Sequence, residues 1–194
     1  MATGMMGEFG EWRRAFIARF PGKIGDILRA NYYRARLAHC GAQPRFAYNI
    51  RILCPEKLSI ADNVEIAWDT VLDATGGIAI GEWSGVGPGS MLLASGEYYT
   101  DPNSPVRKPS MPAQPIRIGR DVWIGANCIV NMGVTIGDGA ILSAGSVIGK
   151  NVPPFALMSG NPARVVGWRK PPEVPAATNP APGNENPTDA NVPT

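Results

Sequence analysis

The sequence is poor in the residues that most often carry metal or disulfide chemistry. Its only histidine is His39, and its three cysteines, Cys40, Cys54 and Cys128, form neither a CxxC pair nor an even disulfide set. We therefore expect His39 to be structural. The cysteines are expected to be buried thiols of a protein in a reducing compartment.

Long apolar runs and blocks of one charge are also missing. No stretch approaches about 18 consecutive apolar residues, and the first twenty residues lack the apolar core of a secretion signal. The formal net charge of +2 comes without a basic block, which argues against nucleic acid binding. With 194 residues, 44% of them hydrophobic, we expect one globular domain, cytoplasmic or at the inner face of a membrane.

The two ends of the chain differ in composition from the middle. Residues 170–194 are rich in Pro, Asn and Ala and lack aromatic residues, which predicts a disordered tail. In residues 1–40, apolar side chains recur at helical spacing on either side of Pro21, which predicts two short amphipathic helices that cap the domain. The alternative is a basic, aromatic face resting on an anionic membrane. Its arginines are Arg13, Arg14 and Arg19.

The middle of the chain carries a hexapeptide repeat. An aliphatic residue returns at every sixth position, as Ile118, Ile124, Val130, Ile136, Leu142 and Ile148. A period of six fits neither an α-helix nor a hairpin sheet, but it fits short strands joined by tight corners, with three hexads to a triangular coil. Residues about 18 apart then stack in parallel fashion, as Ile118 on Ile136, and both ends of the stack need caps.

The same phase is present upstream, with two interruptions. The aliphatic residues are Ile60, Ile66 and Leu72, then, after a two-residue slip at Thr75-Gly76-Gly77, Ile80, Val86 and Leu92. The next aliphatic residue in phase is Ile118. Residues 94–117 are therefore predicted to leave the repeat as a long loop, and long loops on rigid scaffolds often carry function.

Three motifs follow one another in the second half of the chain: VWIGAN, GVTIGDGAILSAGSV and GNPARVV. With them the chain resembles the hexapeptide-repeat acyltransferases of the maltose, galactoside and exopolysaccharide O-acetyltransferase type, over roughly residues 40–169. The resemblance implies an all-β fold, a left-handed parallel β-helix over residues 41–169. It also implies a homotrimer with active sites between subunits, and acetyl-CoA as donor. No metal is expected, because the metal-binding members of this fold use three histidines.

The resemblance also assigns roles to residues on the donor side. Trp123 matches the tryptophan that walls the active site. Ala126 and Ala144 match positions whose backbone groups bind the pantetheine arm, and small side chains let that arm lie close. Lys150 and Arg164 match basic positions near the phosphates of the cofactor. Without the resemblance, each would be an ordinary packing or surface residue.

The acceptor side departs from the family pattern. Family members carry a histidine general base where this chain has Glu97, directly after Gly96. The asparagine that sugar-acetylating relatives often use is also missing, and Trp68 and Asp69 stand in its region. We expect the acceptor pocket to be shaped by Asp69, Tyr98, Tyr99 and Asp101.

Three hypotheses account for Glu97. It is the general base, made basic enough by burial in a cleft; or the acceptor is an amine that needs mainly positioning; or the site is inactive and the trimer is a scaffold or binding partner. We favour the first. The predicted function is acetyl transfer to a saccharide hydroxyl or amine in surface polysaccharide or glycan biosynthesis.

Overall fold

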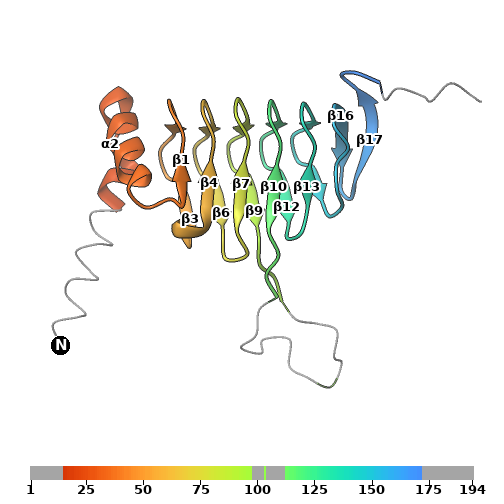
Figure 1. The fold of residues 1–194 in the computed structure, drawn as a ribbon, viewed down its shortest axis with the longest axis horizontal. Helices are drawn as coiled ribbons and strands as arrows, with labels where there is room; N and C mark the ends of the chain where they lie inside the picture. The colour runs from red at the N-terminus through yellow and green to blue at the C-terminus, as the bar shows by residue number, and fades with distance from the viewer. Residues whose placement is uncertain (1–14, 98–102, 104–111, 172–194) are drawn as a thin grey trace, which may run out of the picture.

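Short parallel strands wind around one axis and form a left-handed β-helix, confirming the fold class predicted from the repeat (Figure 1). We analysed a computed structural model, and the structure describes residues 15–97, 103 and 112–171. The predicted tail lies almost entirely outside these residues, as do Tyr98, Tyr99 and Asp101.

The strands form three sheets, one for each side of a triangular prism. Sheet A contains β1 (His39–Cys40), β4 (Leu58–Ile60), β7 (Ile78–Ile80), β10 (Ile116–Ile118) and β13 (Thr135–Ile136). Sheet B contains β2 (Arg45–Phe46), β5 (Glu65–Ile66), β8 (Gly85–Val86), β11 (Trp123–Ile124), β14 (Ile141–Leu142), β16 (Ala156–Gly160) and β17 (Ala163–Trp168). Sheet C contains β3 (Arg51–Leu53), β6 (Val71–Asp73), β9 (Met91–Leu93), β12 (Ile129–Asn131) and β15 (Val147–Ile148).

Because the chain runs from sheet A to B to C and back to A, the prism has three corners. We call them the A–B, B–C and C–A corners. All neighbouring strands are parallel except β16 and β17, which form an antiparallel hairpin at the C-terminal end. Many corner residues have positive φ, and glycine or asparagine relieves the strain there, as at Gly139 (φ 68°) and Asn127 (φ 54°).

The interior is filled by columns of aliphatic side chains, one column for each sheet. Ile118 pairs with Ile136, Ile124 with Leu142 and Val130 with Ile148, which confirms the predicted stacking. All six are at most 5% exposed. Burying a side chain of this size stabilises the fold by about 1.5–3 kcal/mol relative to leaving it in water. The columns therefore fix the register of every coil.

The first coils are longer than the later ones, and the extra residues lie at the C–A corner. Ile60 pairs with Ile80, 20 residues on, whereas Ile118 pairs with Ile136, 18 residues on. The predicted slip at Thr75-Gly76-Gly77 accommodates the excess in one coil. In the coil before it, the 3₁₀ helix η1 (Pro55–Lys57) fills the same corner.

The predicted loop 94–117 was too wide at its C-terminal end. Ile116 and Arg117 belong to β10, and buried Ile116 pairs with buried Ile78. The sequence argument counted one inward aliphatic for each hexad, but strands of sheet A carry two. An antiparallel bridge between Ser95 and Ala113 closes the base of the connection.

Two buried serines join the coils on either side of this connection. Ser84 Oγ donates to the Gly119 carbonyl (2.8 Å) and accepts from the backbone of Val122 (3.1 Å). Ser90 repeats the arrangement with Gly125 and Cys128, at 2.9 and 3.1 Å. The register therefore continues across the insertion.

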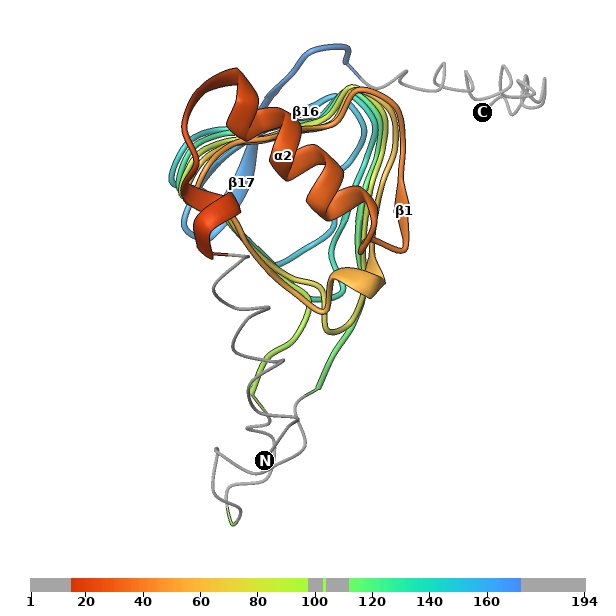
Figure 2. The ribbon, with the colours of Figure 1, turned by 90° about the vertical axis from the view of Figure 1, so that its left-hand side faces the viewer.

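A helix closes the N-terminal end of the prism. Residues 15–19 are helical, and α2 (Gly22–Arg34) follows Pro21 and packs on β1 and β2. Figure 2, which looks along the prism, shows α2 lying across its near end. Sequence analysis placed the end of this cap at residue 40, whereas β1 already begins at His39, which is exposed.

Arg29 is the central residue of the cap. Its side chain is 1% exposed and donates to the carbonyls of Phe46 (2.7 Å) and Phe20 (2.5 Å) and to Asp26 (2.5 Å). Tyr33 lies on the ring of Phe46 at a centroid distance of 4.8 Å. The exposed end of a solenoid needs partners for its backbone groups, and here a buried guanidinium supplies them.

The outer side of the cap is apolar. Exposed fractions are 65% for Phe16, 65% for Ile24 and 59% for Ile27. In the described part of the chain, no helix is long and apolar enough to cross a membrane.

Arg29→Ala should lower the free energy of unfolding by about 3 kcal/mol, because it leaves buried carbonyls without donors. Urea denaturation of the wild type, Arg29→Ala and the control Lys23→Ala, an exposed position on the same helix, measures the effect. Equal stability of all three would show that the guanidinium does not hold the cap.

Candidate functional site

Trp123 stands on the outer face of sheet B in β11 and is half-exposed (50%). Its ring lies over Gly85 of the neighbouring strand β8, where a Cβ atom would come within 2.6 Å of the ring. Glycine at position 85 therefore makes the room for the indole. A large exposed aromatic ring held flat on a sheet offers a wall for a ligand.

A second aromatic surface lies at the B–C corner beside this face. The rings of Tyr48 and Trp68 are stacked, with centroids 6.1 Å apart and planes 8° from parallel, and both are nearly half-exposed. In the adjacent positions, Asn49 Nδ2 donates a hydrogen bond to the carboxylate of Asp69. Asp69 is thus an exposed acceptor beside an aromatic surface, as an acceptor-binding role requires.

The predicted donor residues Ala126 and Ala144 lie in neighbouring coils at the same corner. The backbone of Gly145 donates to the carbonyl of Ala126 (2.8 Å), and a Cβ on Gly125 would approach the backbone nitrogen of Ala144 to 2.6 Å. Small residues keep the corner low along this edge. An extended arm can therefore lie against the backbone there.

Glu97 and Lys150 occupy a different corner. Glu97 is exposed and follows sheet C at the base of the connection, where the backbone of Gly96 donates to the carbonyl of Pro112 (3.0 Å). Lys150 follows β15 and is exposed at the same C–A corner. The burial expected for Glu97 is not provided by the described part of its own chain.

The two groups of predicted residues lie on opposite sides of one chain. In a three-sided prism, the C–A corner is opposite the face of sheet B. Figure 2 shows β16 of sheet B on one side and the connection leaving on the other. Glu97 therefore cannot meet Trp123 of the same chain across the filled interior, and a site that uses both needs two chains.

The remaining predicted residue, Arg164, lies in β17. Its side chain is exposed, and its guanidinium donates to the Ala163 carbonyl at 2.9 Å. It is near the hairpin turn that contains the cis peptide Asn161-Pro162.

The cysteines do not offer a nucleophile. Cys128 is buried as predicted, whereas Cys40 and Cys54 are partly buried, and all three are free thiols. Burial raises the pKa of Cys128, and it raises the pKa of Cys40 despite the nearby Arg34. Both thiols therefore stay protonated near neutral pH. Among the described residues, no three His, Cys, Asp or Glu side chains gather as metal ligands do.

Asp73 holds the base of the connection. Its carboxylate accepts hydrogen bonds from Ser95 Oγ and from the hydroxyl and backbone of Thr75, at 2.6 and 3.0 Å for Thr75. Burial acts to raise the pKa of Asp73, but these hydrogen bonds outweigh it and hold the pKa below its usual value. The ionised carboxylate thus fastens the segment that leads to Glu97.

Sequence reasoning missed Gly85, Tyr48 and Asp73. Each has a signal that depends on the coil length. Tyr48 is 20 residues before Trp68, the spacing of the first coils, so the two share a corner. Gly85 lies directly below Trp123 only once the 38-residue step across the connection is known.

Comparisons with known proteins agree with this geometry. A family model described as "Hexapeptide repeat of succinyl-transferase" matches residues 115–150. Galactoside O-acetyltransferase of Escherichia coli is 34% identical over 128 residues, 66% of this chain and 52% of that protein. A hexapeptide-repeat acetyltransferase of Vibrio cholerae complexed with acetyl coenzyme A is 26% identical with a TM-score of 0.73, over 81% of this chain and 84% of that one.

A maltose O-acetyltransferase of Clostridium difficile is similar to the same degree, with 25% identity and a TM-score of 0.73 over 82% of this chain and 84% of that one. The fold is that of the left-handed β-helix acyltransferases. The chain belongs to the hexapeptide-repeat acyltransferase family. It spans about half the length of the E. coli enzyme that it matches.

Asp73→Asn should destabilise the protein by about 1–2 kcal/mol at pH 7, because hydrogen bonds to an ionised carboxylate are lost. The folded pKa lies below the unfolded value of about 3.9, so the contribution is full above that pH and is lost as the pH falls through the folded pKa. Urea denaturation at pH 7 and near pH 3 should show the difference shrinking. Glu56→Gln, exposed on η1, is the control. An equal deficit at both pH values would contradict the ionic role.

Proposed function

We propose that the protein is an acetyl-CoA-dependent acyltransferase that acetylates a saccharide hydroxyl or amine. The observation that carries the proposal is the placement of Trp123 over Gly85, next to the small-residue edge formed by Ala126 and Ala144. This is a wall beside a channel. Relatives of the same fold are O-acetyltransferases, and one is complexed with acetyl coenzyme A.

The active unit in this proposal is a homotrimer. Glu97 and Lys150 lie on the corner opposite Trp123, so neighbouring chains must contribute the two halves of one site. With sheet C facing the threefold axis, the C–A corner of each chain meets the B–C corner of the next. Each interface then contains one complete set of residues, and a trimer has three sites.

In the proposed reaction, the acyl donor lies along the B–C corner with its thioester beside Trp123. Lys150 and Arg164 offer cations to its phosphates. The carboxylate of Glu97 from the neighbouring chain takes the proton of the acceptor hydroxyl while the hydroxyl oxygen attacks the thioester carbonyl. The carbon–sulfur bond then breaks, and the coenzyme A thiolate leaves and takes up a proton.

On the acceptor side, Asp69 would accept hydrogen bonds from hydroxyl groups, and the stacked Tyr48 and Trp68 would contact the apolar face of a sugar ring. We assign Tyr98, Tyr99 and Asp101 to the same pocket. A surface polysaccharide or another glycan under construction is the acceptor that this combination suits. The partly buried free thiols fit a cytoplasmic location.

Acetyl-CoA should bind the wild type with a dissociation constant in the micromolar range, about −8 kcal/mol. Trp123→Ala and Lys150→Ala should weaken binding at least tenfold by calorimetry. Trp83→Asn, which removes an exposed tryptophan from a different corner, should bind as the wild type does. No binding by the wild type would favour the scaffold alternative.

In the same series, Glu97→Gln should retain the affinity for acetyl-CoA and lose about 10²- to 10⁴-fold in the rate of coenzyme A release with saccharide acceptors. Full activity of Glu97→Gln with amino sugars would support the amine hypothesis instead. Unfolding and refolding a mixture of Trp123→Ala and Glu97→Gln should restore activity, because some interfaces then combine both intact halves. No recovery would contradict a shared site.

We also propose that the cap holds the protein at an anionic membrane. Phe16, Ile24 and Ile27 expose an apolar surface on the cap, and Arg13, Arg14 and Arg19 lie in the same part of the sequence. Apolar side chains beside arginines suit the interface of an anionic bilayer.

Neutralising Arg13, Arg14 and Arg19 should reduce co-sedimentation with phosphatidylglycerol vesicles by about 100-fold, since each basic residue contributes about 1 kcal/mol. The control neutralises three exposed arginines of the sheets, Arg45, Arg51 and Arg117, and should retain binding. Equal losses in both variants would mean that net charge alone acts. A wild type that stays in the supernatant would refute membrane contact.

A further inference from the structure

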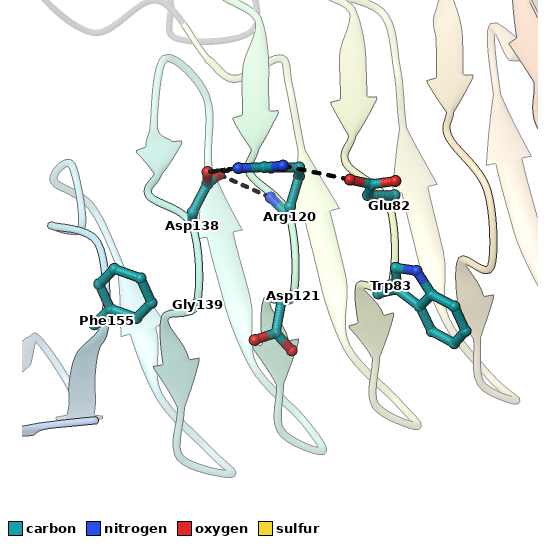
Figure 3. Close-up of a pocket in the computed structure, with 7 residues that line it drawn as sticks. All are labelled: Glu82, Trp83, Arg120, Asp121, Asp138, Gly139 and Phe155. Atoms are coloured by element: carbon teal, nitrogen blue, oxygen red, sulfur yellow. Dashed lines mark hydrogen bonds and ion pairs between the residues drawn. The ribbon is translucent and has the colours of Figure 1, made fainter. Parts of the chain in front are cut away.

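A hollow of about 500 Å³ lies on the A–B corner, away from every residue assigned above to acetyl transfer. The transfer residues occupy the face of sheet B, the β17 hairpin and the other two corners. Figure 3 shows the residues that line the hollow, which come from successive coils and form a row along the prism. They are Glu82, Trp83, Arg120, Asp121, Asp138, Gly139 and Phe155.

Two aromatic side chains stand at the ends of this row. Trp83 is 67% exposed, and the ring of Phe155 lies over Gly139, where a Cβ atom would come within 2.4 Å of it. Trp83, Asp121, Gly139 and Phe155 occupy the same corner position in successive coils, about 4.8 Å apart, so the row is about 14 Å long. That length suits an extended ligand rather than an ion.

The backbone at the two aromatic positions is unfavourable for aromatic residues. Trp83 has φ 59° and Phe155 has φ 60°, a conformation that bulky side chains rarely adopt. Asparagine holds the same corner position in an earlier coil, at Asn63 with φ 57°. The fold does not need a tryptophan there, and residues kept in such a conformation tend to mark functional sites.

The charged groups between the aromatic rings are rich in hydrogen-bond acceptors. Arg120 lies between Glu82 (3.5 Å) and Asp138 (3.3 Å), as Figure 3 shows. Asp121 is paired with Arg169 at 2.9 Å. Three carboxylates face two guanidinium groups, so the corner disfavours anions such as nucleic acid or sulfated polymers. It favours a ligand that donates hydrogen bonds.

We propose that the A–B corner is a saccharide-binding site separate from the transfer site. The partly positive C–H groups of a sugar ring are attracted to the negative face of an aromatic ring, which Trp83 offers. The carboxylates of Glu82 and Asp138 accept hydrogen bonds from hydroxyl groups, and the fixed guanidinium of Arg120 donates to ring and hydroxyl oxygens. The site would hold part of a glycan chain on the outside of the assembly.

This site requires neither acetyl transfer nor acetyl-CoA, so its test is independent of the proposed reaction. The probes are three hexasaccharides: maltohexaose, which is neutral, hexameric glucosamine, which is cationic, and a heparin hexasaccharide, which is anionic. Binding is followed by the indole N–H resonance of Trp83, assigned with Trp83→Asn. Neutral or cationic hexasaccharides should shift this resonance, and the heparin hexasaccharide should not.

The decisive variant is Trp83→Asn, because asparagine suits a positive φ. We expect it to keep or raise the midpoint of thermal unfolding while saccharide affinity, measured by calorimetry, falls at least tenfold. Phe155→Asn should behave similarly, and Phe16→Ala, which removes an equally exposed aromatic ring from the cap, should bind as the wild type does. Acetyl-CoA affinity should be unchanged in all three.

Three outcomes would overturn the proposal. The first is that no hexasaccharide binds at millimolar concentration, and the second is that Trp83→Asn binds as well as the wild type. The third is that Trp83→Asn changes the sedimentation coefficient, which would identify the corner as a contact between copies of the chain.

Discussion

The structure depends on the hydrogen bonding of each coil to the coils above and below it. A coil has few partners of its own, so its strands are stable only when the aliphatic columns hold the next coil in register. Ile60, Ile80, Ile118 and Ile136 lie in one such column although the chain between them varies in length. Each corner of the prism is consequently a straight edge, and side chains far apart in sequence are aligned along it.

This alignment is what creates sites. The B–C corner gathers small residues and a pair of stacked aromatic rings, the C–A corner gathers the connection and Lys150, and the A–B corner gathers acids, arginines and aromatic rings. Because a prism keeps its three corners apart, one chain presents three chemically different edges. Acyl transfer as proposed combines two of these edges from neighbouring chains and leaves the third one free.

Much of the fold was predictable because the repeat is a direct signature of the coil. The aliphatic period gave the stacking, and Pro21 marked the break between helical segments. The ends of the connection were less certain, since Ile116 continues the column of sheet A before the residue that the period marks. The role of Gly85 under Trp123 and the hydrogen bonds of Asp73 depend on contacts between coils that a linear count does not show.

The bridge between Ser95 and Ala113 has a consequence for how such a protein diversifies. Pairing on both sides of the connection, together with the serines at positions 84 and 90, fixes the register without using any residue between the two ends of the bridge. The inserted segment can change in length or composition while the prism stays in place. New specificities could therefore arise by exchanging this one segment, as a replaceable module on a constant support.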